Sequence, residues 1–229
     1  MSRTRPVVAI DGPAGSGKST TAKLVAERLG FMHIDTGAMY RAVTLKVLRS
    51  GVELAEARAV RGMLASTRVT LQRGESGVRV LLDGEDVTEQ IRSPQVTRLV
   101  SRVSSLRAVR EAMVRDQRAL GRDGGIVLEG RDIGTVVFPD AEVKFFLNAN
   151  LDERVRRRLA ELNAQGVEAS EAELRREIQE RDRMDSTRQE SPLRKAPDAI
   201  ELDTSSLSIE EQVRAVTEHV KAMMKERGQ

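Results

Sequence analysis

The 229-residue sequence contains no cysteine and no tryptophan, only two histidines, and 2 % aromatic residues. The absence of cysteine excludes disulfides, thiolate nucleophiles and cysteine-ligated zinc, and two separated histidines do not make a histidine-rich metal centre. It also fits a reducing compartment. Few aromatic residues and a net charge of +3, from 38 basic and 35 acidic residues, argue against a dedicated nucleic-acid-binding protein.

Long apolar runs are also missing. No stretch approaches the roughly 20 apolar residues that a membrane span requires. The N-terminal residues carry two arginines and pass directly into a glycine-rich stretch, which leaves no apolar core for a signal peptide. We therefore expect one enzyme-sized cytoplasmic protein that binds neither membranes nor nucleic acid.

Five short apolar runs predict β-strands, and most of them lack polar alternation. Because long helical patterns separate the runs, they favour an α/β fold with a parallel sheet covered on both faces. The predicted strands are Val7 to Ile10, Phe31 to Ile34, Gly125 to Gly130, Val143 to Leu147, and Ala199 to Leu202.

The helix signals come from capping residues. Ser93 with Pro94 predicts the start of one long helix that ends near Gly121. Capping-box spacing marks three more helix starts, at Asn150 with Glu153, Ser170 with Glu173, and Ser208 with Glu211. Residues 68–92 instead alternate in polarity around two glycine-containing turns, which predicts a small antiparallel β insert.

The stretch "GPAGSGKS", Gly12 to Ser19, matches the phosphate-binding pattern G-x-x-x-x-G-K-[ST]. It lies between a predicted strand and a helix that ends at Gly30. In such a loop the backbone N–H groups converge on phosphate oxygens, Lys18 adds a positive charge, and the Ser19 hydroxyl binds Mg²⁺. The predicted ATP-binding residues of this segment are Gly12, Pro13, Ala14, Gly15, Ser16, Gly17, Lys18, Ser19 and Thr20.

Polar and cationic residues follow the next predicted strands, where ligands of an open α/β sheet bind. Asp35, Thr36 and Gly37 predict a turn with Arg41 about one helical turn further on. A second such loop carries Arg131 and Asp132. Arginine forks suit phosphate groups, so these loops indicate an acceptor site.

A third cluster lies in "ERDRMDSTR", where Arg181, Asp185 and Arg188 are spaced to share one face of a helix. Each arginine cluster by itself also fits an ordinary charged surface. The phosphate loop alone permits a GTPase, a motor or regulatory ATPase, or a small-molecule kinase. A guanine-reading N-K-x-D motif is absent.

Taken together, these features resemble the bacterial cytidylate kinases, a family of nucleoside monophosphate kinases. The resemblance extends over nearly the whole chain and is carried by "IDGPAGSGKST", "DTGAMYRA", "EDVTEQIR", "VREAM", "GRDIGTVVFPDA", "ERDRMDSTR" and "LDTSSLSIEE". It implies a three-layer P-loop fold with a five-stranded parallel sheet. It also implies a monomer with a core (1–67, 93–150 and 189–229), an acceptor-side β insert (68–92) and an arginine-rich lid (151–188).

The resemblance implies phosphoryl transfer from ATP to CMP or dCMP with Mg²⁺, and it assigns roles to residues. The implied CMP-binding residues are Thr36, Arg41, Ser101, Arg110, Arg131, Asp132, Arg181, Asp185 and Arg188. The residues expected to act on the reacting phosphates are Lys18, Arg41, Arg131, Arg158 and Arg181, and Arg157 is expected to contact ATP. Thr36 stands where some members carry serine. Glu129 stands where others carry aspartate, beside the Mg²⁺ ligands.

Two other functions remain open on the sequence. One is a P-loop kinase of another small acceptor, such as UMP, AMP or shikimate. The other is an ATP-switched interaction protein whose arginine face binds an acidic partner or RNA.

Overall fold

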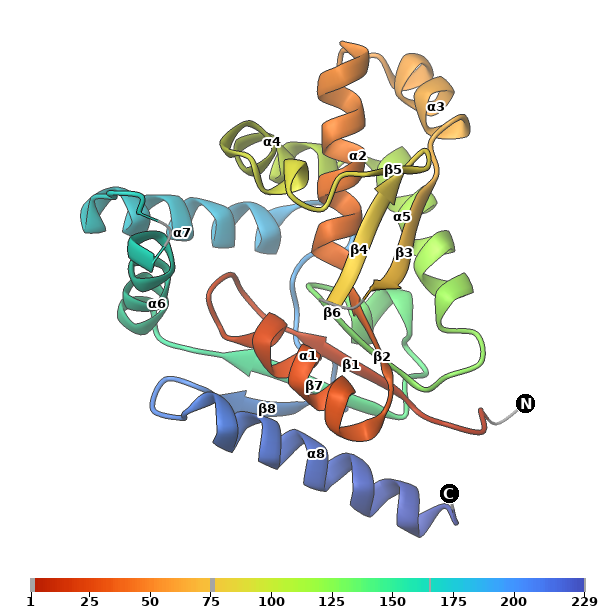
Figure 1. The fold of residues 1–229 in the computed structure, drawn as a ribbon, viewed down its shortest axis with the longest axis vertical. Coiled ribbons are helices and arrows are strands. Elements are labelled where there is room, and N and C mark those ends of the chain that lie inside the picture. Colours follow the sequence, from red (N-terminus) through yellow and green to blue (C-terminus); the bar gives the residue numbers. More distant parts are fainter. Residues whose placement is uncertain (1–2, 75–76, 165, 229) are drawn as a thin grey trace. The chain divides into compact units, whose positions relative to one another are not determined.

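A five-stranded sheet forms the centre of the computed structural model, which describes residues 3–74, 77–164 and 166–228. Its strand order is β2-β6-β1-β7-β8, with β1 pairing in parallel with β6 and β7, and β7 with β8 (Figure 1). The bounds are β1 Val7–Asp11, β2 Met32–Asp35, β6 Ile126–Gly130, β7 Val143–Asn148 and β8 Ile200–Asp203. The five predicted strands and the α/β fold are confirmed.

Burial explains why the central strands lack polar alternation. Every residue of β1 and of β6 is buried, whereas β8 at the sheet edge is largely exposed. A strand that is covered on both faces must be apolar throughout, apart from residues at its end. The polar residues at the ends of these two strands are Asp11 and Glu129, both buried.

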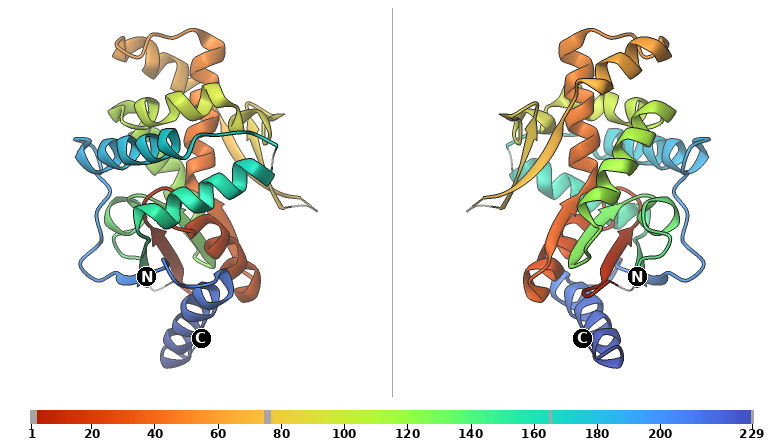
Figure 2. Two further views of the ribbon diagram at one scale, coloured as in Figure 1. Left: turned by 90° about the vertical axis from the view of Figure 1, so that its left-hand side faces the viewer. Right: turned by 90° about the vertical axis from the view of Figure 1, so that its right-hand side faces the viewer.

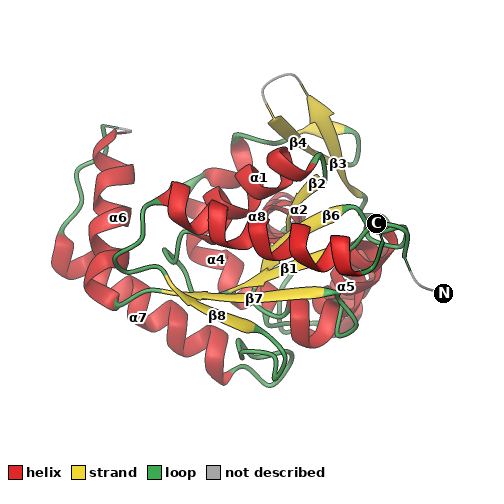
Figure 3. Ribbon diagram, turned by 90° about the horizontal axis from the view of Figure 1, so that it is seen from below, coloured by secondary structure: helices red, strands yellow, loops and turns green. Residues whose placement is uncertain are grey.

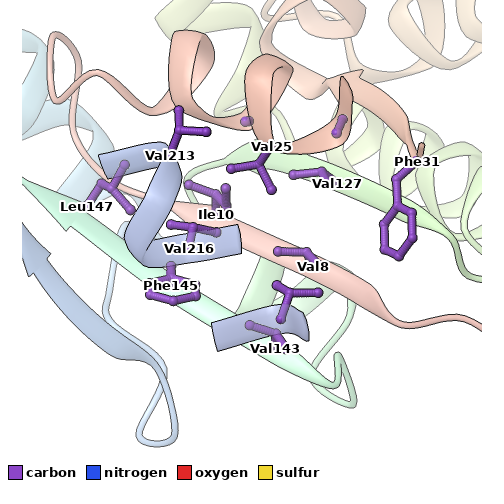
Figure 4. Close-up of a cluster of buried hydrophobic side chains, with 13 residues drawn as sticks. Val8, Ile10, Val25, Phe31, Val127, Val143, Phe145, Leu147, Val213 and Val216 are labelled. Carbon is purple, nitrogen blue, oxygen red and sulfur yellow. The ribbon is translucent and has the colours of Figure 1, made fainter. Parts of the chain in front are cut away.

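Helices α1 (Lys18–Leu29) and α8 (Ile209–Glu226) pack over one face of this sheet (Figure 3). Val213, Val216 and Val220 recur along α8 at helical spacing, and all three are fully buried. They meet strand residues such as Ile10 and Phe145 in the main hydrophobic core (Figure 4). Ser208 and Glu211 form the capping box predicted for the start of α8.

The chain divides into two compact units, residues 1–33 with 121–229, and residues 34–120. The first unit also contains the π-helical turn η2 (Ile133–Val137) and helices α6 (Leu151–Ala164) and α7 (Glu171–Thr187). Helices α6 and α7 pack together through Val155, Leu174 and Ile178. The division into core, insert and lid stays a prediction.

The second unit is built around α2 (Thr36–Ser50). Its other helices are α3 (Ala57–Ala65), α4 (Pro94–Ser104), α5 (Arg107–Leu120) and the 3-10 turn η1 (Gln90–Arg92). A three-stranded antiparallel sheet, β3 (Val69–Gly74), β4 (Gly77–Leu82) and β5 (Glu85–Asp86), packs against α2 through β4 (Figure 2).

This sheet confirms the predicted β insert. The first of its two predicted turns includes residues 75–76, which lie outside the described residues. The second is a two-residue hairpin loop in which Asp83 and Gly84 have φ of 52° and 91°. Positive φ at both central residues is what a tight hairpin turn of this hand requires.

Three local predictions were wrong in detail. The single long helix predicted from Ser93 to Gly121 is two helices, because the hydroxyls of Ser104 and Ser105 bond back to carbonyls of the last turn of α4 and end it. The predicted turn at residues 35–37 is instead the start of α2, with Asp35 as the N-cap that accepts the Ala38 N–H at 2.9 Å. Arg188 lies just beyond α7 as its C-cap, not on the helix.

Of the other predicted capping boxes, Asn150 accepts the Glu153 N–H at 2.8 Å, whereas Ser170 makes no side-chain capping bond. Among the described residues, no helix combines the length and apolar character needed to cross a membrane.

Candidate active site

The predicted phosphate loop connects the end of β1 to the start of α1. At Gly12 any side chain is excluded, because a Cβ there would lie 2.1 Å from the Leu147 carbonyl oxygen. Gly17 is the N-cap of α1 and has φ of 85°, a left-handed conformation that glycine adopts without strain. Both glycines allow the backbone to curl tightly at the N-terminus of a helix, where anions bind.

Lys18 is buried at the start of α1, and its ammonium group donates to the Pro13 carbonyl at 3.2 Å. The side chain therefore folds back across the loop and holds its charge at the Pro13 carbonyl. Ser16 is fully buried, whereas Ser19 and Thr20 are exposed. This arrangement is a positively charged cradle for an anion such as a phosphate chain.

Ser19 and Glu129 form the polar pair beside this cradle. The Ser19 hydroxyl donates to Oε2 of Glu129 at 2.6 Å, and Nε2 of His33 lies 3.5 Å from Oε1. Burial raises the pKa of Glu129. The His33 contact, the Lys18 charge and the Ser19 hydroxyl together lower the pKa by more than burial raises it, so the pKa lies below its usual value. Glu129 thus presents an ionised carboxylate next to a hydroxyl.

These two oxygen groups fit a hard cation such as Mg²⁺. No group of three or more His, Asp or Glu side chains in the described ranges could hold a metal ion by itself. A magnesium ion at Ser19 would therefore take most of its ligands from phosphate and water oxygens.

Arg131 and Asp132 lie on the loop between β6 and η2. Nε of Arg131 donates to Oδ2 of Asp185 on α7 at 2.8 Å. Arg188 lies 3.7 Å from Asp132 and 3.9 Å from Asp185. The loop after β6 and the end of α7 thus bring together four of the predicted acceptor residues.

The electrostatics of this cluster keep Asp185 ionised. Burial raises its pKa, but the positive charges of Arg131, Arg181 and Arg188 outweigh burial and lower the pKa below the usual value. Asp185 is therefore a charged partner that orients the neighbouring guanidinium groups, and it does not supply a proton. The predicted helical face is correct for Arg181 and Asp185, which both lie on α7.

Arg157 on α6 contacts a residue that the sequence analysis missed, Thr204. Its guanidinium donates to the Thr204 carbonyl at 2.5 Å and to the Thr204 hydroxyl at 3.1 Å. The same hydroxyl lies 2.9 Å from the Ser16 carbonyl and 3.0 Å from the Asn148 carbonyl. Thr204 therefore joins α6, the phosphate loop and the end of β7, and only its place after a strand could have indicated this.

Arg154 is a second missed residue. Its guanidinium donates to the Ala14 carbonyl of the phosphate loop at 3.2 Å and to Asp182 of α7 at 2.6 Å. The sequence signal was weak because Arg154 is one of four arginines in "DERVRRRL". Arg158 from the same run is half-buried, and its guanidinium donates to Glu161 at 2.9 Å.

The remaining predicted acceptor residues belong to the second unit. Thr36 is buried at the start of α2, and Arg41 on the same helix donates to Thr97 of α4 at 3.0 Å. Arg110 on α5 is buried, donates to the Ser104 carbonyl at 3.2 Å, and lies 5.3 Å from the centre of the Tyr40 ring. Ser101 is half-buried on α4.

A glycine-rich loop between a central parallel strand and a helix, with the lysine and serine in place, defines a P-loop nucleotide-binding protein. The family model for cytidylate kinase matches residues 8–222. The chain therefore belongs to the cytidylate kinase family, and the resemblance seen in the sequence is confirmed.

Individual relatives agree. The chain is 52 % identical over 222 residues to a cytidylate kinase of Pelotomaculum thermopropionicum, covering 96 % of this chain and 98 % of that protein. It is 51 % identical to a cytidylate kinase of Geobacillus kaustophilus, covering 95 % and 97 %. In fold alone, it is similar to an uncharacterized protein from Eubacterium ventriosum, with a TM-score of 0.52, 11 % identity, and 95 % and 99 % coverage.

Proposed function

We propose that this chain transfers the γ-phosphoryl group of ATP to CMP or dCMP with the help of Mg²⁺, forming ADP and CDP or dCDP. The observation that carries the proposal is the family match over residues 8–222, which includes both the phosphate loop and the arginine-bearing loop after β6. A kinase of another acceptor, or an ATP-driven switch, would not require a match to the cytidylate kinase family over both the phosphate loop and the loop after β6.

On the donor side, the loop amides and Lys18 bind the β- and γ-phosphates of ATP. Arg157, fixed to Thr204, is placed beside the phosphate loop to contact the same nucleotide. Arg154 keeps the start of α6 against the loop through the Ala14 carbonyl. Mg²⁺ supplies charge neutralisation between the phosphates, and Ser19 with the Glu129 carboxylate beside it would hold that ion.

On the acceptor side, Arg131 binds the monophosphate of CMP while Asp185 holds the guanidinium in place. The expected cytosine-side contacts are Ser101, Arg110, Asp132 and Arg188. Thr36 and Arg41 add a hydroxyl and a second guanidinium for the acceptor phosphate. Arg181 and Asp185 supply contacts to the sugar.

Phosphoryl transfer requires mainly that the protein position the two substrates and stabilise charge on the transferred group. An oxygen of the CMP phosphate is already a competent nucleophile, so no general base is required. Arginines acting on the migrating phosphoryl group, with Arg158 and Arg181 as candidates, stabilise the charge that spreads over its oxygens. Residues 151–188 act as the lid that excludes water, since water would otherwise take the phosphoryl group. A cytoplasmic monomer stays the expected form.

Transfer of labelled phosphate tests the proposal. With γ-³²P-ATP, Mg²⁺ and CMP, the label is expected in CDP, and Lys18→Ala is expected to remove it. Exposed Lys23→Ala, on the same helix, is the matched control and should transfer at the wild-type rate. Label that appears only as free phosphate, or that stays in ATP with CMP and dCMP, would contradict the proposed function.

A further inference from the structure

Asp11 is a buried carboxylate at the base of the candidate site, and neither the P-loop pattern nor the predicted acceptor set includes it. It ends β1, directly before the first glycine of the phosphate loop, and is 4 % exposed. Its two carboxylate oxygens accept backbone N–H groups, Oδ1 from Ile133 and Oδ2 from Gly134, both at 2.8 Å. These two donors directly follow Arg131 and Asp132.

We propose that Asp11 is a positioning residue for the acceptor nucleotide: it fixes the backbone at residues 133–134 so that Arg131 and Asp132 face CMP. The proposal rests on the proposed function. The same side chain ties the acceptor loop to the strand end from which the phosphate loop begins.

The backbone at this point needs such an anchor. Residues 133–137 form a π-helical turn, in which the Val137 and Phe138 N–H groups bond to carbonyls five residues earlier. Turns of this kind are uncommon and tend to occur at functional sites. The first N–H groups of a helical turn have no partner within it, and the Asp11 carboxylate satisfies two of them at once.

The chemistry of the contact selects a carboxylate. In its ionised form, which predominates above its pKa of about 7, the Asp11 carboxylate only accepts hydrogen bonds, so both of its oxygens match backbone N–H donors. Asparagine has nearly the same shape but would point an amide N–H₂ at one of the two donors. Residue 134 also has little spare room, since a Cβ there would lie 3.1 Å from Cδ of Lys144 and 3.5 Å from Oδ2 of Asp11.

Asp11 also interacts electrostatically with Arg131 and Asp132. The pKa of Asp11 is raised to about 7. Burial is the main cause; the Gly134 and Ile133 N–H groups oppose it, the Asp132 charge adds to it and the Arg131 charge opposes it. The carboxylate is therefore close enough to both charges for each to affect its ionisation. Asp11 is therefore linked to Arg131 and Asp132 both by electrostatic interaction and by its hydrogen bonds to the residues that follow them.

The Asp11→Asn variant tests the proposal through two separate affinities. Calorimetry should show the Kd for CMP rising about tenfold or more, equivalent to about 1.4 kcal/mol. The Kd for a non-hydrolysable ATP analogue should stay within about twofold, because both hydrogen bonds go to the acceptor loop. In steady state, KM for CMP should rise while KM for ATP does not. Thermal unfolding shows that the variant is folded.

Glu142→Gln is the matched control. Oε2 of Glu142 accepts the Val7 N–H at 2.8 Å, so it is also a carboxylate bonded to backbone, but at the opposite end of β1. It should leave the Kd of CMP unchanged. A general loosening of the sheet would instead affect both variants alike.

A double-mutant cycle tests the route of the effect. If Asp11 acts through the Arg131 loop, Asp11→Asn should weaken CMP binding much less in an Arg131→Ala background than in the wild type. Gly134→Ala brings a Cβ to 3.1 Å from Cδ of Lys144, which crowds the backbone at one of the two N–H groups that Asp11 accepts, and should also weaken CMP binding selectively. It serves as the second variant if Asp11→Asn does not fold.

Three outcomes overturn the inference: an unchanged Kd for CMP in folded Asp11→Asn and Gly134→Ala, an equal loss of ATP-analogue affinity, or full additivity with Arg131→Ala. Each of these leaves the proposed function standing, because the wild-type protein would still bind and phosphorylate CMP. A wild-type protein that neither binds nor phosphorylates CMP would overturn both.

Discussion

Arg131 and Asp185 form a partly buried ion pair at 2.8 Å, with side chains 15 % and 8 % exposed. The pair links the loop after β6 to helix α7, two segments 54 residues apart in sequence. Arg131 donates through Nε to the carboxylate, and its Nη1 donates to the Gly130 carbonyl at 3.3 Å. Asp185 therefore orients the Arg131 guanidinium, which we propose to bind the acceptor phosphate, while lying outside the phosphate loop.

Arg131→Ala is expected to reduce kcat/KM for CMP by about two to three orders of magnitude, because it removes a charge aimed at the acceptor phosphate. ATP-analogue binding should be nearly unchanged, since the residue follows a different strand from the phosphate loop. The matched control is Arg183→Ala, an exposed arginine of α7 paired with Glu180, which should keep full activity. Loss of ATP affinity equal to the loss of turnover would show that Arg131 is misplaced here.

Glu129→Gln is expected to weaken the binding of Mg²⁺ to the enzyme–ADP complex, so that half-maximal binding requires a Mg²⁺ concentration about tenfold higher or more. The amide keeps a hydrogen-bond acceptor for Ser19 but loses the charge beside the metal ligand, and such outer partners affect metal affinity by about this much. The Mg²⁺ affinity of Glu129→Asp should lie between those of the wild type and Glu129→Gln, because aspartate keeps the charge but has a shorter side chain. Calorimetric Mg²⁺ titration measures the effect, and a wild-type affinity in Glu129→Gln would exclude the role.

Thr204→Val should weaken ATP binding about five- to tenfold, since a buried hydroxyl that holds Arg157 and reaches the Ser16 and Asn148 carbonyls is lost. Thr204→Ser keeps the hydroxyl and serves as the control. CMP affinity should change little in both variants. If valine and serine variants bound ATP equally well, the hydroxyl network would have no part in holding the nucleotide.

Asp11 also predicts a pH dependence of stability. Its pKa is about 7 in the folded protein and near the ordinary value of 3.8 in the unfolded chain. The stability that this difference contributes is fully present below about pH 4 and is lost as the pH rises to about 7. The melting temperature of the wild type relative to Asp11→Asn should therefore fall from pH 5 to pH 7.5. A difference that is constant or that rises over this range would contradict the raised pKa.

Elements with strong local signals could be predicted from the sequence. The five strands were visible because buried parallel strands are apolar throughout, and the capping box at Ser208 marked the start of α8. The phosphate loop was visible because its chemistry requires a fixed spacing of glycines, lysine and serine. The β insert was visible through its alternation and the Asp83–Gly84 turn.

Interactions between distant segments could not be predicted in this way. Nothing in the sequence near Asp11 indicates that its partners are the N–H groups of residues 133 and 134, because backbone donors leave no side-chain signature. Thr204 and Arg154 were hidden for a similar reason, as each bonds to carbonyls of the phosphate loop. The break between α4 and α5 depends on two serines that a helical pattern alone tolerates.

The central claim is that the phosphate held by the loop at residues 12–19 goes to a cytidine monophosphate. Its most direct test is coupled ADP production with ATP and Mg²⁺, comparing CMP, dCMP, UMP, AMP and no acceptor. Strong turnover is expected with CMP and dCMP and little without an acceptor. ADP formation that is independent of the acceptor, or greater with AMP or UMP than with CMP, would contradict the account.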